Sequence, residues 1–267
     1  MIELAPGHKQ GLVLRSAVML AAGSAGFGAE YRGLVDFSAL GALVTHPLTW
    51  AARRPAVSAQ AVATPGGVLI HSGLPNPGVN AAVRRYGGQW QKLGCPVIVH
   101  LAAESPEGVQ RSVVRLEGVT GVTGIELGFR DDVHSGEAAA MIAAAVSDLP
   151  LLVQAPAGRG VEFAALAGRA GAQAVVVGGG GRAAAPGRDG VVNGRLYGPL
   201  VFAQTLYAVE QVRATTALPV VAVGGVCGEA QARALLQAGA LAVQVDGWLW
   251  ADPASVTQLA HTLRDAD

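Results

Sequence analysis

Two adjacent glycines, Gly224 and Gly225, follow a short apolar run in the C-terminal part of the chain. The run, Pro219–Val223, is typical of a buried strand, and a segment of helical period comes directly after the glycines. Backbone N–H groups at such a strand-to-helix turn can bind a phosphate group, helped by the dipole of the following helix. The alternative is a tight turn that needs glycine only for its positive φ. Since both requirements can coincide, we expect a phosphate-binding turn here.

A second apolar run, Leu241–Val245, ends in Asp246 and Gly247. The turn at these two residues and the turn at Gly224 and Gly225 would together form one phosphate-binding cup. Backbone N–H groups of this pair could also bind the phosphate group. A carboxylate beside a phosphate dianion repels it, so binding requires the Asp246 side chain to point away from the cup. The sequence therefore predicts a phosphate site that depends on the orientation of Asp246.

Acid–base chemistry has two candidate residues, His46 and Asp131, each placed after a predicted strand. A histidine with a nearby carboxylate can act as an acid–base pair. Burial could raise the pKa of Asp131 enough for it to abstract a proton. The alternatives are that His46 caps a turn before Pro47 and that Asp131 lies in a solvated loop.

Cations in this chain are almost all arginine. Of 19 lysines and arginines, only Lys9 and Lys92 are lysines, so a mechanism that needs lysine must use one of those two positions. Arginine binds phosphate and carboxylate in a bidentate manner, although a plain surface position is the alternative for each one. The arginines that could meet an anion are Arg130, Arg182, Arg188 and Arg195.

Histidines, cysteines and carboxylates do not cluster with metal-ligand spacing, so no metal site is predicted.

Short apolar runs alternate with segments of helical period along the chain, which predicts βα repetition and a parallel sheet. Strands buried on both faces are expected to be continuously apolar. Eight such strands in 267 residues predict an α/β fold, a single (β/α)8 TIM barrel domain over residues 1–267. In that fold the loops after strands seven and eight bind phosphate. The predicted strands are Val18–Ala21, Ala42–Thr45, Val97–Leu101, Gly124–Leu127, Leu151–Gln154, Ala174–Val177, Val220–Val223 and Ala242–Val245.

Seven helices are predicted between and after these strands. Ser105 and Asp252 each precede a proline, which places a capping residue before proline at the first helical position. The predicted helices are Asn80–Leu93, Pro106–Glu117, Ser135–Ser147, Gly160–Ala170, Pro199–Thr215, Gly228–Ala238 and Pro253–Asp265.

Two segments do not fit the βα repeat. Gly67–Ser72 is hairpin-like and is expected outside the barrel. Gly178–Gly198 shows no period and is predicted to be a long loop after strand six, on the catalytic face. A loop of this length in a compact domain is usually functional, and a flexible surface excursion is the alternative.

Bulk properties exclude several function classes. The formal net charge is zero, so no overall basic field attracts nucleic acid. Two cysteines, Cys95 and Cys227, give no disulfide framework, and with no signal peptide they predict a cytoplasmic protein. No apolar run reaches the roughly 18 residues that span a bilayer, so no membrane partner is expected.

Four segments carry a resemblance to a known family. Val18–Gly23 ends in a small-residue turn, and Gly41–Thr45 is similar to a second barrel strand. Gly73–Val79 is similar to a Gly-Leu-x-Asn-Pro-Gly motif, and Gly194–Pro199 stands before the paired glycines in place of Gly-Gly-x-Ser-Gly-Pro. Over nearly its whole length the chain thus resembles the dihydroorotate dehydrogenase family of FMN-dependent barrels.

The resemblance implies FMN as cofactor, a small-molecule ligand and a homodimer. Taken with the residue chemistry above, it predicts substrate binding by Ser72, Gly73, Leu74 and Arg130, and catalysis by Asp131 or His46. The positions that it assigns to cofactor binding are Ala22, Gly23, Thr45, Gln154, Gly198, Gly224, Gly225, Asp246 and Gly247.

The chain departs from the family pattern at positions where the family has catalytic and ligand-binding residues. His46 follows Thr45 where the family has Thr-Lys, and Gln154 stands where it has a second lysine. Residues 126–133 read Glu-Leu-Gly-Phe-Arg-Asp-Asp-Val where the family has Glu-Leu-Asn-x-Ser-(Cys or Ser)-Pro-Asn, so Asp131 replaces the base. The lost amides would pair with an orotate-type substrate, each worth about 1 kcal/mol. We therefore expect a substrate other than dihydroorotate.

Three functions remain open at this point. The first is a divergent FMN-dependent oxidoreductase. The second is a non-catalytic relative, such as a partner or regulatory subunit, with a degenerate flavin site. The third is a non-redox barrel enzyme that acts on a phosphorylated metabolite.

Overall fold

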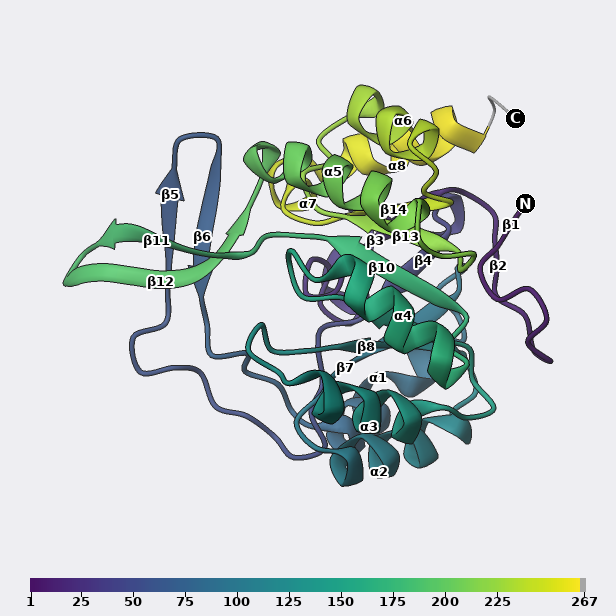
Figure 1. The fold of residues 1–267 in the computed structure, drawn as a ribbon. Coiled ribbons are helices and arrows are strands. Elements are labelled where there is room, and N and C mark those ends of the chain that lie inside the picture. Colours follow the sequence, from purple (N-terminus) through teal and green to yellow (C-terminus); the bar gives the residue numbers. More distant parts are fainter. Residues whose placement is uncertain (265–267) are drawn as a thin grey trace.

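A closed barrel of eight parallel strands forms the centre of the computed structural model, which describes residues 1–264 (Figure 1). Each predicted strand overlaps one barrel strand, and the (β/α)8 prediction is confirmed. In order around the barrel the strands are β3 (Val18–Leu20), β4 (Ala42–Val44), β7 (Val97–Ala102), β8 (Val122–Gly128), β9 (Leu151–Gln154), β10 (Ala174–Gly178), β13 (Val220–Val223) and β14 (Ala242–Val245).

The barrel strands are apolar because both of their faces are buried. Met19, Ile98 and Val221 belong to the cluster that fills the barrel interior. A hairpin of β1 (Ile2–Glu3) and β2 (Val13–Leu14), which the sequence did not predict, adds Leu4, Leu12 and Leu14 to this cluster. Leu12 lies beside Gly124 near the start of β8, so the hairpin closes the amino-terminal end of the barrel.

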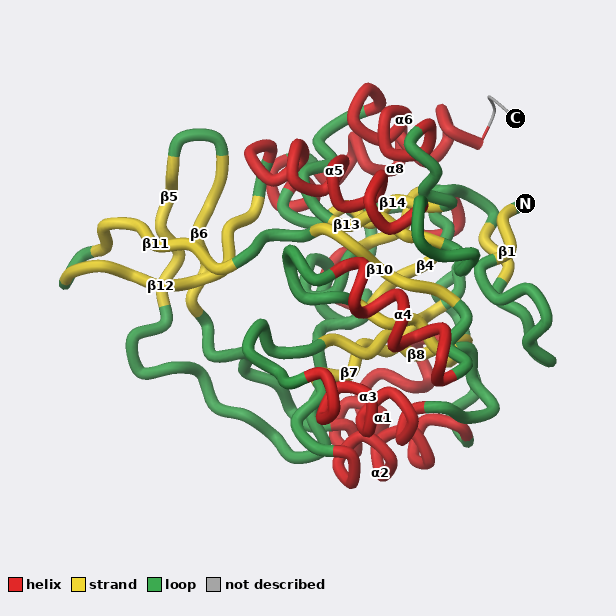
Figure 2. Tube along the Cα trace, viewed as in Figure 1, coloured by secondary structure: helices red, strands yellow, loops and turns green. Residues whose placement is uncertain are grey.

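Helices pack around the outside of the barrel (Figure 2). Both predicted caps are confirmed: Ser105 Oγ accepts from the Gly108 N–H at 3.1 Å, and Asp252 Oδ1 accepts from the Ser255 N–H at 3.2 Å. The helices are α1 (Val79–Trp90), α2 (Pro106–Glu117), α3 (Ser135–Ala145), α4 (Gly160–Ala170), α5 (Phe202–Arg213), α6 (Glu229–Gln237), α7 (Trp248–Ala251) and α8 (Pro253–Arg264), with 3-10 turns η1 (Ala29–Tyr31), η2 (Phe37–Ala39) and η3 (Pro199–Val201).

The helix predictions differ from the structure mainly at the ends. The predicted helix Pro199–Thr215 begins as the 3-10 turn η3 and ends at Arg213. The short helix α7 was not predicted. Asp265, the predicted last residue of the final helix, lies outside the described residues.

A second sheet projects from the side of the barrel where the strands have their carboxyl ends (Figures 1 and 2). The prediction of an irregular loop over Gly178–Gly198 is wrong, because most of this segment forms a hairpin. The hairpin forms because of tertiary contacts. Its second strand, β12, pairs with β6, and Leu69, Ala185 and Val192 form a small hydrophobic core of their own. Four antiparallel strands make up this sheet, in the order β11 (Arg182–Gly187), β12 (Gly190–Tyr197), β6 (Gly67–His71) and β5 (Gln60–Thr64).

Candidate functional site

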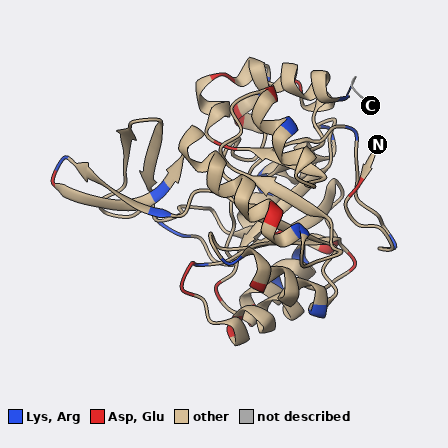
Figure 3. Ribbon diagram, turned by 45° about the horizontal axis from the view of Figure 1, so that its top comes forward, with Lys and Arg blue, Asp and Glu red and all other residues tan. Residues whose placement is uncertain are grey.

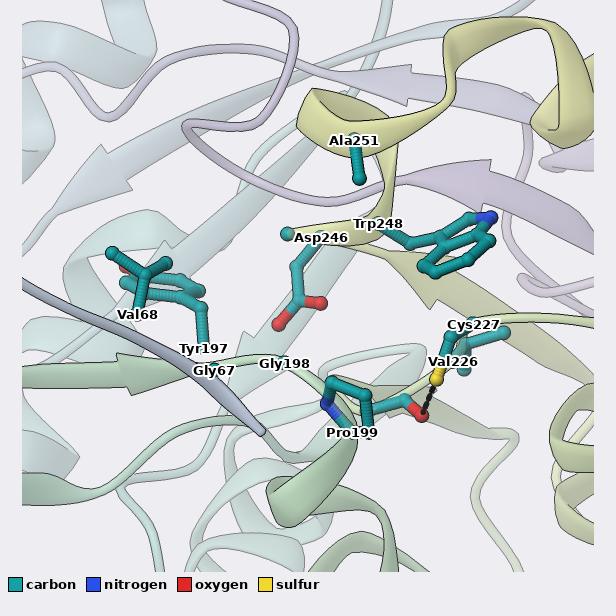
Figure 4. Close-up of a pocket in the computed structure, with 12 residues that line it drawn as sticks. Gly67, Val68, Tyr197, Gly198, Pro199, Val226, Cys227, Asp246, Trp248 and Ala251 are labelled. Carbon is teal, nitrogen blue, oxygen red and sulfur yellow. Dashed lines mark hydrogen bonds between the residues drawn. The ribbon is translucent and has the colours of Figure 1, made fainter. Parts of the chain in front are cut away.

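A pocket of about 210 Å³ lies at the carboxyl ends of β13 and β14, where the sequence predicts a phosphate cup (Figure 4). Three parts of the chain meet there: the turn after β13, the turn after β14 with α7, and the junction of β6 with the end of β12. Loops at the carboxyl ends of barrel strands carry the active sites of this fold. The lining residues are Gly67, Val68, Tyr197, Gly198, Pro199, Gly225, Val226, Cys227, Asp246, Gly247, Trp248 and Ala251.

The paired glycines make a sharp turn that another residue could not adopt. Gly224 has φ of 93° and Gly225 has φ of 78°, both in the left-handed region. A Cβ on Gly225 would lie 2.3 Å from the backbone nitrogen of Phe202, at the start of α5. The Gly224 N–H donates to the Gln244 carbonyl at 3.4 Å, so it takes part in the sheet. The Gly225 N–H instead faces the side chain of Asp246.

Asp246 turns its carboxyl group into the pocket, between the end of β12 and the turn after β13 (Figure 4). The residue is 4% exposed, and burial raises the pKa of its carboxyl from 3.8 to about 6. The N–H groups of Gly247, Asp246 itself and Gly225 lower this pKa in part. Within residues 1–264, Oδ1 has no hydrogen-bond partner. The carboxyl group therefore lies on the cup side of the turn, the orientation that opposes a phosphate.

The turn after β3 is held against the cup by aromatic residues. Trp250 donates from Nε1 to the Ser24 carbonyl at 2.9 Å and meets Tyr197 edge-on, with ring centroids 5.2 Å apart. Gly23 has φ of 83°, and Ala22 precedes it; both are half-buried. The predicted cofactor-binding turn at Ala22 and Gly23 thus adjoins the predicted phosphate cup.

His46 lies at the end of β4, between the turn after β3 and the turn at Pro75. Its Nε2 is 2.9 Å from the Pro75 carbonyl oxygen, which can only accept, so Nε2 carries the proton. Burial lowers the pKa of His46, which favours the neutral ring, and Nδ1 then keeps a lone pair. Nδ1 faces Gly23, where an added Cβ would be 3.9 Å away. His46 is thus held as a neutral acceptor at the mouth of the barrel.

The segment that precedes Pro75 is a strained turn. Leu74 has φ of 57°, the only non-glycine residue in the left-handed region among residues 1–264, and Gly73 has φ of 76°. Ser72 Oγ accepts from the Leu74 N–H at 3.2 Å and so helps to fix this conformation. Strain of this kind costs about 1 kcal/mol or more and tends to be kept at functional sites.

Asp131, in the loop after β8, is bound by two arginines from the projecting hairpin. Arg195 Nη2 is 3.0 Å from one carboxylate oxygen, and Arg182 Nε is 3.2 Å from the other. Basic residues lie where this hairpin leaves the barrel (Figure 3). Arg130, the adjacent candidate, is exposed and pairs with Asp132 at 3.4 Å. No hydrogen bond joins Asp131 to His46 in the described chain, so the two candidates are not an acid–base pair.

A polar chain that sequence reasoning missed crosses the barrel interior. Glu126 is fully buried and accepts from His100 Nδ1 at 2.9 Å and from Gln244 Nε2 at 2.6 Å. The Thr45 hydroxyl accepts from the His100 N–H at 3.2 Å, and Gln154 lies beside the His100 ring near Gly128. Single polar residues inside apolar strands were the available signal.

This chain has relatives among known proteins. No family model matches it. The catalytic subunit of dihydroorotate dehydrogenase B (NAD(+)) from Desulforudis audaxviator is 31% identical, over 95% of this chain and 89% of the relative. The chain belongs to the dihydroorotate dehydrogenase family. The same subunit from Citrifermentans bemidjiense is 27% identical over 95% of this chain and 90% of its own.

The fold is also that of a solved dihydroorotate dehydrogenase. The Eimeria tenella enzyme, crystallised with ferulenol, superposes with a TM-score of 0.75 at 14% identity, over 93% of this chain and 79% of that one. The resemblance stated from the sequence motifs is therefore confirmed at the level of family and fold. No helix within residues 1–264 is long and apolar enough to cross a membrane.

The cup of this dihydroorotate dehydrogenase relative fits the phosphate of FMN only in part. Gly198, Gly225 and Gly247 leave room for a close approach, since none has a side chain. The Asp246 carboxyl group does not fit, because it faces the Gly225 and Gly247 N–H groups that a phosphate would need. None of the residues that line the pocket is lysine or arginine. A phosphate dianion would meet a negative group there without a cation between them.

Proposed function

We propose that this chain is a flavin-dependent oxidoreductase of the dihydroorotate dehydrogenase family, acting on a small molecule other than dihydroorotate. The observation that carries the proposal is the placement of His46. A neutral imidazole stands between Gly23 and the turn at Pro75, and both segments belong to motifs that resemble the family. A bound flavin would supply the hydride acceptor, which no side chain can provide.

His46 is the proposed proton acceptor in preference to Asp131. Nδ1 of His46 has a lone pair, and a neutral imidazole is a competent base near neutral pH. Asp131 is bound by Arg182 and Arg195, which occupy both of its carboxylate oxygens. In this scheme His46 Nδ1 would accept the proton that the substrate loses on oxidation.

The substrate is proposed to differ from dihydroorotate because its expected amide partners are missing. Gly128 ends β8 and Phe129 follows it, where the family has an asparagine-containing segment. Phe129 is buried edge-on against Phe163, with ring centroids 5.0 Å apart, so it packs in the core. A substrate less rich in donors and acceptors suits these residues better.

The test is flavin reduction under anaerobic conditions. Purified protein should show visible flavin absorbance, alone or after addition of flavin, and dihydroorotate should not bleach it. With a substrate found by screening, H46Q should lower the reduction rate by about 100-fold or more and leave flavin affinity unchanged. H134Q, at an exposed residue, serves as the control. Rapid bleaching by dihydroorotate would refute the substrate proposal, and failure to bind any flavin would refute the whole.

A non-catalytic relative is the second candidate. Two observations favour it: Gln154 stands in place of a family lysine, and the Asp246 carboxyl group lies in the cup. Protein that binds no flavin would support this candidate. The third function, a barrel enzyme for a phosphorylated metabolite, is disfavoured by Asp246 for the same electrostatic reason as FMN.

Assembly and location also belong to the proposal. We expect a homodimer in the cytoplasm, as the family resemblance and the cysteine content imply. Light scattering of the purified protein measures the first, and fractionation of the source cells measures the second.

A further inference from the structure

The buried carboxyl group of Asp246 is an incomplete hydrogen-bond partner aimed into a pocket. The residue is 4% exposed, and its Oδ1 has no partner within residues 1–264. Its Oδ2 lies against the glycine turn, 3.3 Å from where a Cβ on Gly224 would be. A buried polar oxygen without a partner is costly, so a ligand that donates a hydrogen bond to it would gain affinity.

The surroundings of this carboxyl group select against an anion. The N–H groups of Gly225 and Gly247 lie close enough to the Asp246 carboxyl group to lower its pKa, so an anion in the cup would have to compete with that carboxyl group for them. The titratable side chains that face it are Tyr197 and Cys227, and neither brings a positive charge. The apolar part of the pocket wall includes Val68, Val226 and Trp248. An uncharged group with a hydroxyl donor matches this environment.

We infer that the cup accepts the uncharged hydroxyl end of its ligand, with Asp246 as the acceptor, and that this chain binds riboflavin in preference to FMN. The inference rests on the proposed function, because it takes the ligand to be a flavin. The two flavins share the isoalloxazine ring and the ribityl chain. They differ in the terminal group, a hydroxyl in riboflavin and a phosphate in FMN. The cup therefore decides between them.

The experiment is a pair of fluorescence titrations of the full chain with riboflavin and with FMN, at about pH 8. Wild type should bind riboflavin about 100-fold more tightly than FMN, in keeping with like charges that meet in a buried site. D246G should reverse or abolish this preference, because it frees the Gly225 and Gly247 N–H groups for phosphate. D246N, which keeps the side-chain volume, should reduce the preference by weakening the repulsion. D189N, at an exposed hairpin residue, should leave it unchanged.

The outcomes separate the inference from the proposed function. If wild type binds FMN as tightly as riboflavin, the inference fails and the proposed function stands. If neither flavin binds, both fail. A preference for riboflavin that persists in D246G and in D246N, with both variants folded by circular dichroism, would overturn the role assigned to Asp246. If D246G does not fold, the titrations of D246N decide the same question.

Discussion

Replacing Asp246 by asparagine should stabilise the protein, and the gain should depend on pH. Burial raises the pKa of this carboxyl from 3.8 to about 6, so the folded state holds the proton more tightly than the unfolded state does. Well below pH 3.8 the group is protonated in both states and costs nothing. As the pH rises through 6, the cost of a buried charge develops fully. At 1.36 kcal/mol per pKa unit it amounts to about 3 kcal/mol above about pH 7.

The assay is urea unfolding of wild type and D246N at several pH values from about 3 to 8. The variant should match wild type at the acid end and exceed its free energy of unfolding by about 3 kcal/mol at the alkaline end. D189N is the control, since Asp189 is exposed in the β11–β12 turn. A stability difference that stays constant across this pH range, or a D246N variant less stable than wild type at pH 8, would refute the reasoning.

Three further predictions concern the glycine turn, the β11–β12 hairpin and the polar chain in the barrel interior. G225A should lose about 2 kcal/mol or more in urea unfolding, because its Cβ would meet backbone 2.3 Å away; G158A, with φ of 77° and open space, should lose less. D131N should lose about 1 kcal/mol or less, because its ion pairs are partly exposed, but amide exchange in the β11–β12 hairpin should accelerate. E126Q should lose about 3 kcal/mol by thermal or urea unfolding, because its new amide would face a donor from His100 or Gln244. Equal losses in G225A and G158A, unchanged hairpin exchange in D131N, or a neutral E126Q would each contradict the corresponding argument.

The barrel could be predicted from the sequence because its signals are local. Each strand is a continuous apolar run that ends in a turn, and buried parallel strands require that pattern. The glycine turn at Gly224 and Gly225 could also be predicted, since glycine adopts the positive φ of this turn more readily than any other residue. Family motifs then located the cup, the turn after β3 and the turn at Pro75 on one face.

The remaining features depend on residues distant in the sequence. Nothing local shows that Gly178–Gly198 forms a hairpin, because its second strand is stabilised by pairing with β6. The contact between Glu126 and Gln244 spans the barrel interior, and sequence spacing does not reveal it. For Asp246 the sequence indicated that phosphate binding depends on the orientation of its side chain. It could not predict that orientation, because packing around the turn sets it.

Pairing between β6 and β12 joins Ile70 to Arg195, two residues separated by nearly half of the chain. Closing so long a loop costs chain entropy, so we expect this ladder to form after most of the barrel has assembled. The wall of the cup that Val68 and Tyr197 form would then be absent from the transition state for folding. A ligand held by that wall would stabilise the native state alone. It would prolong the lifetime of the folded protein and leave the rate at which the chain folds almost unchanged.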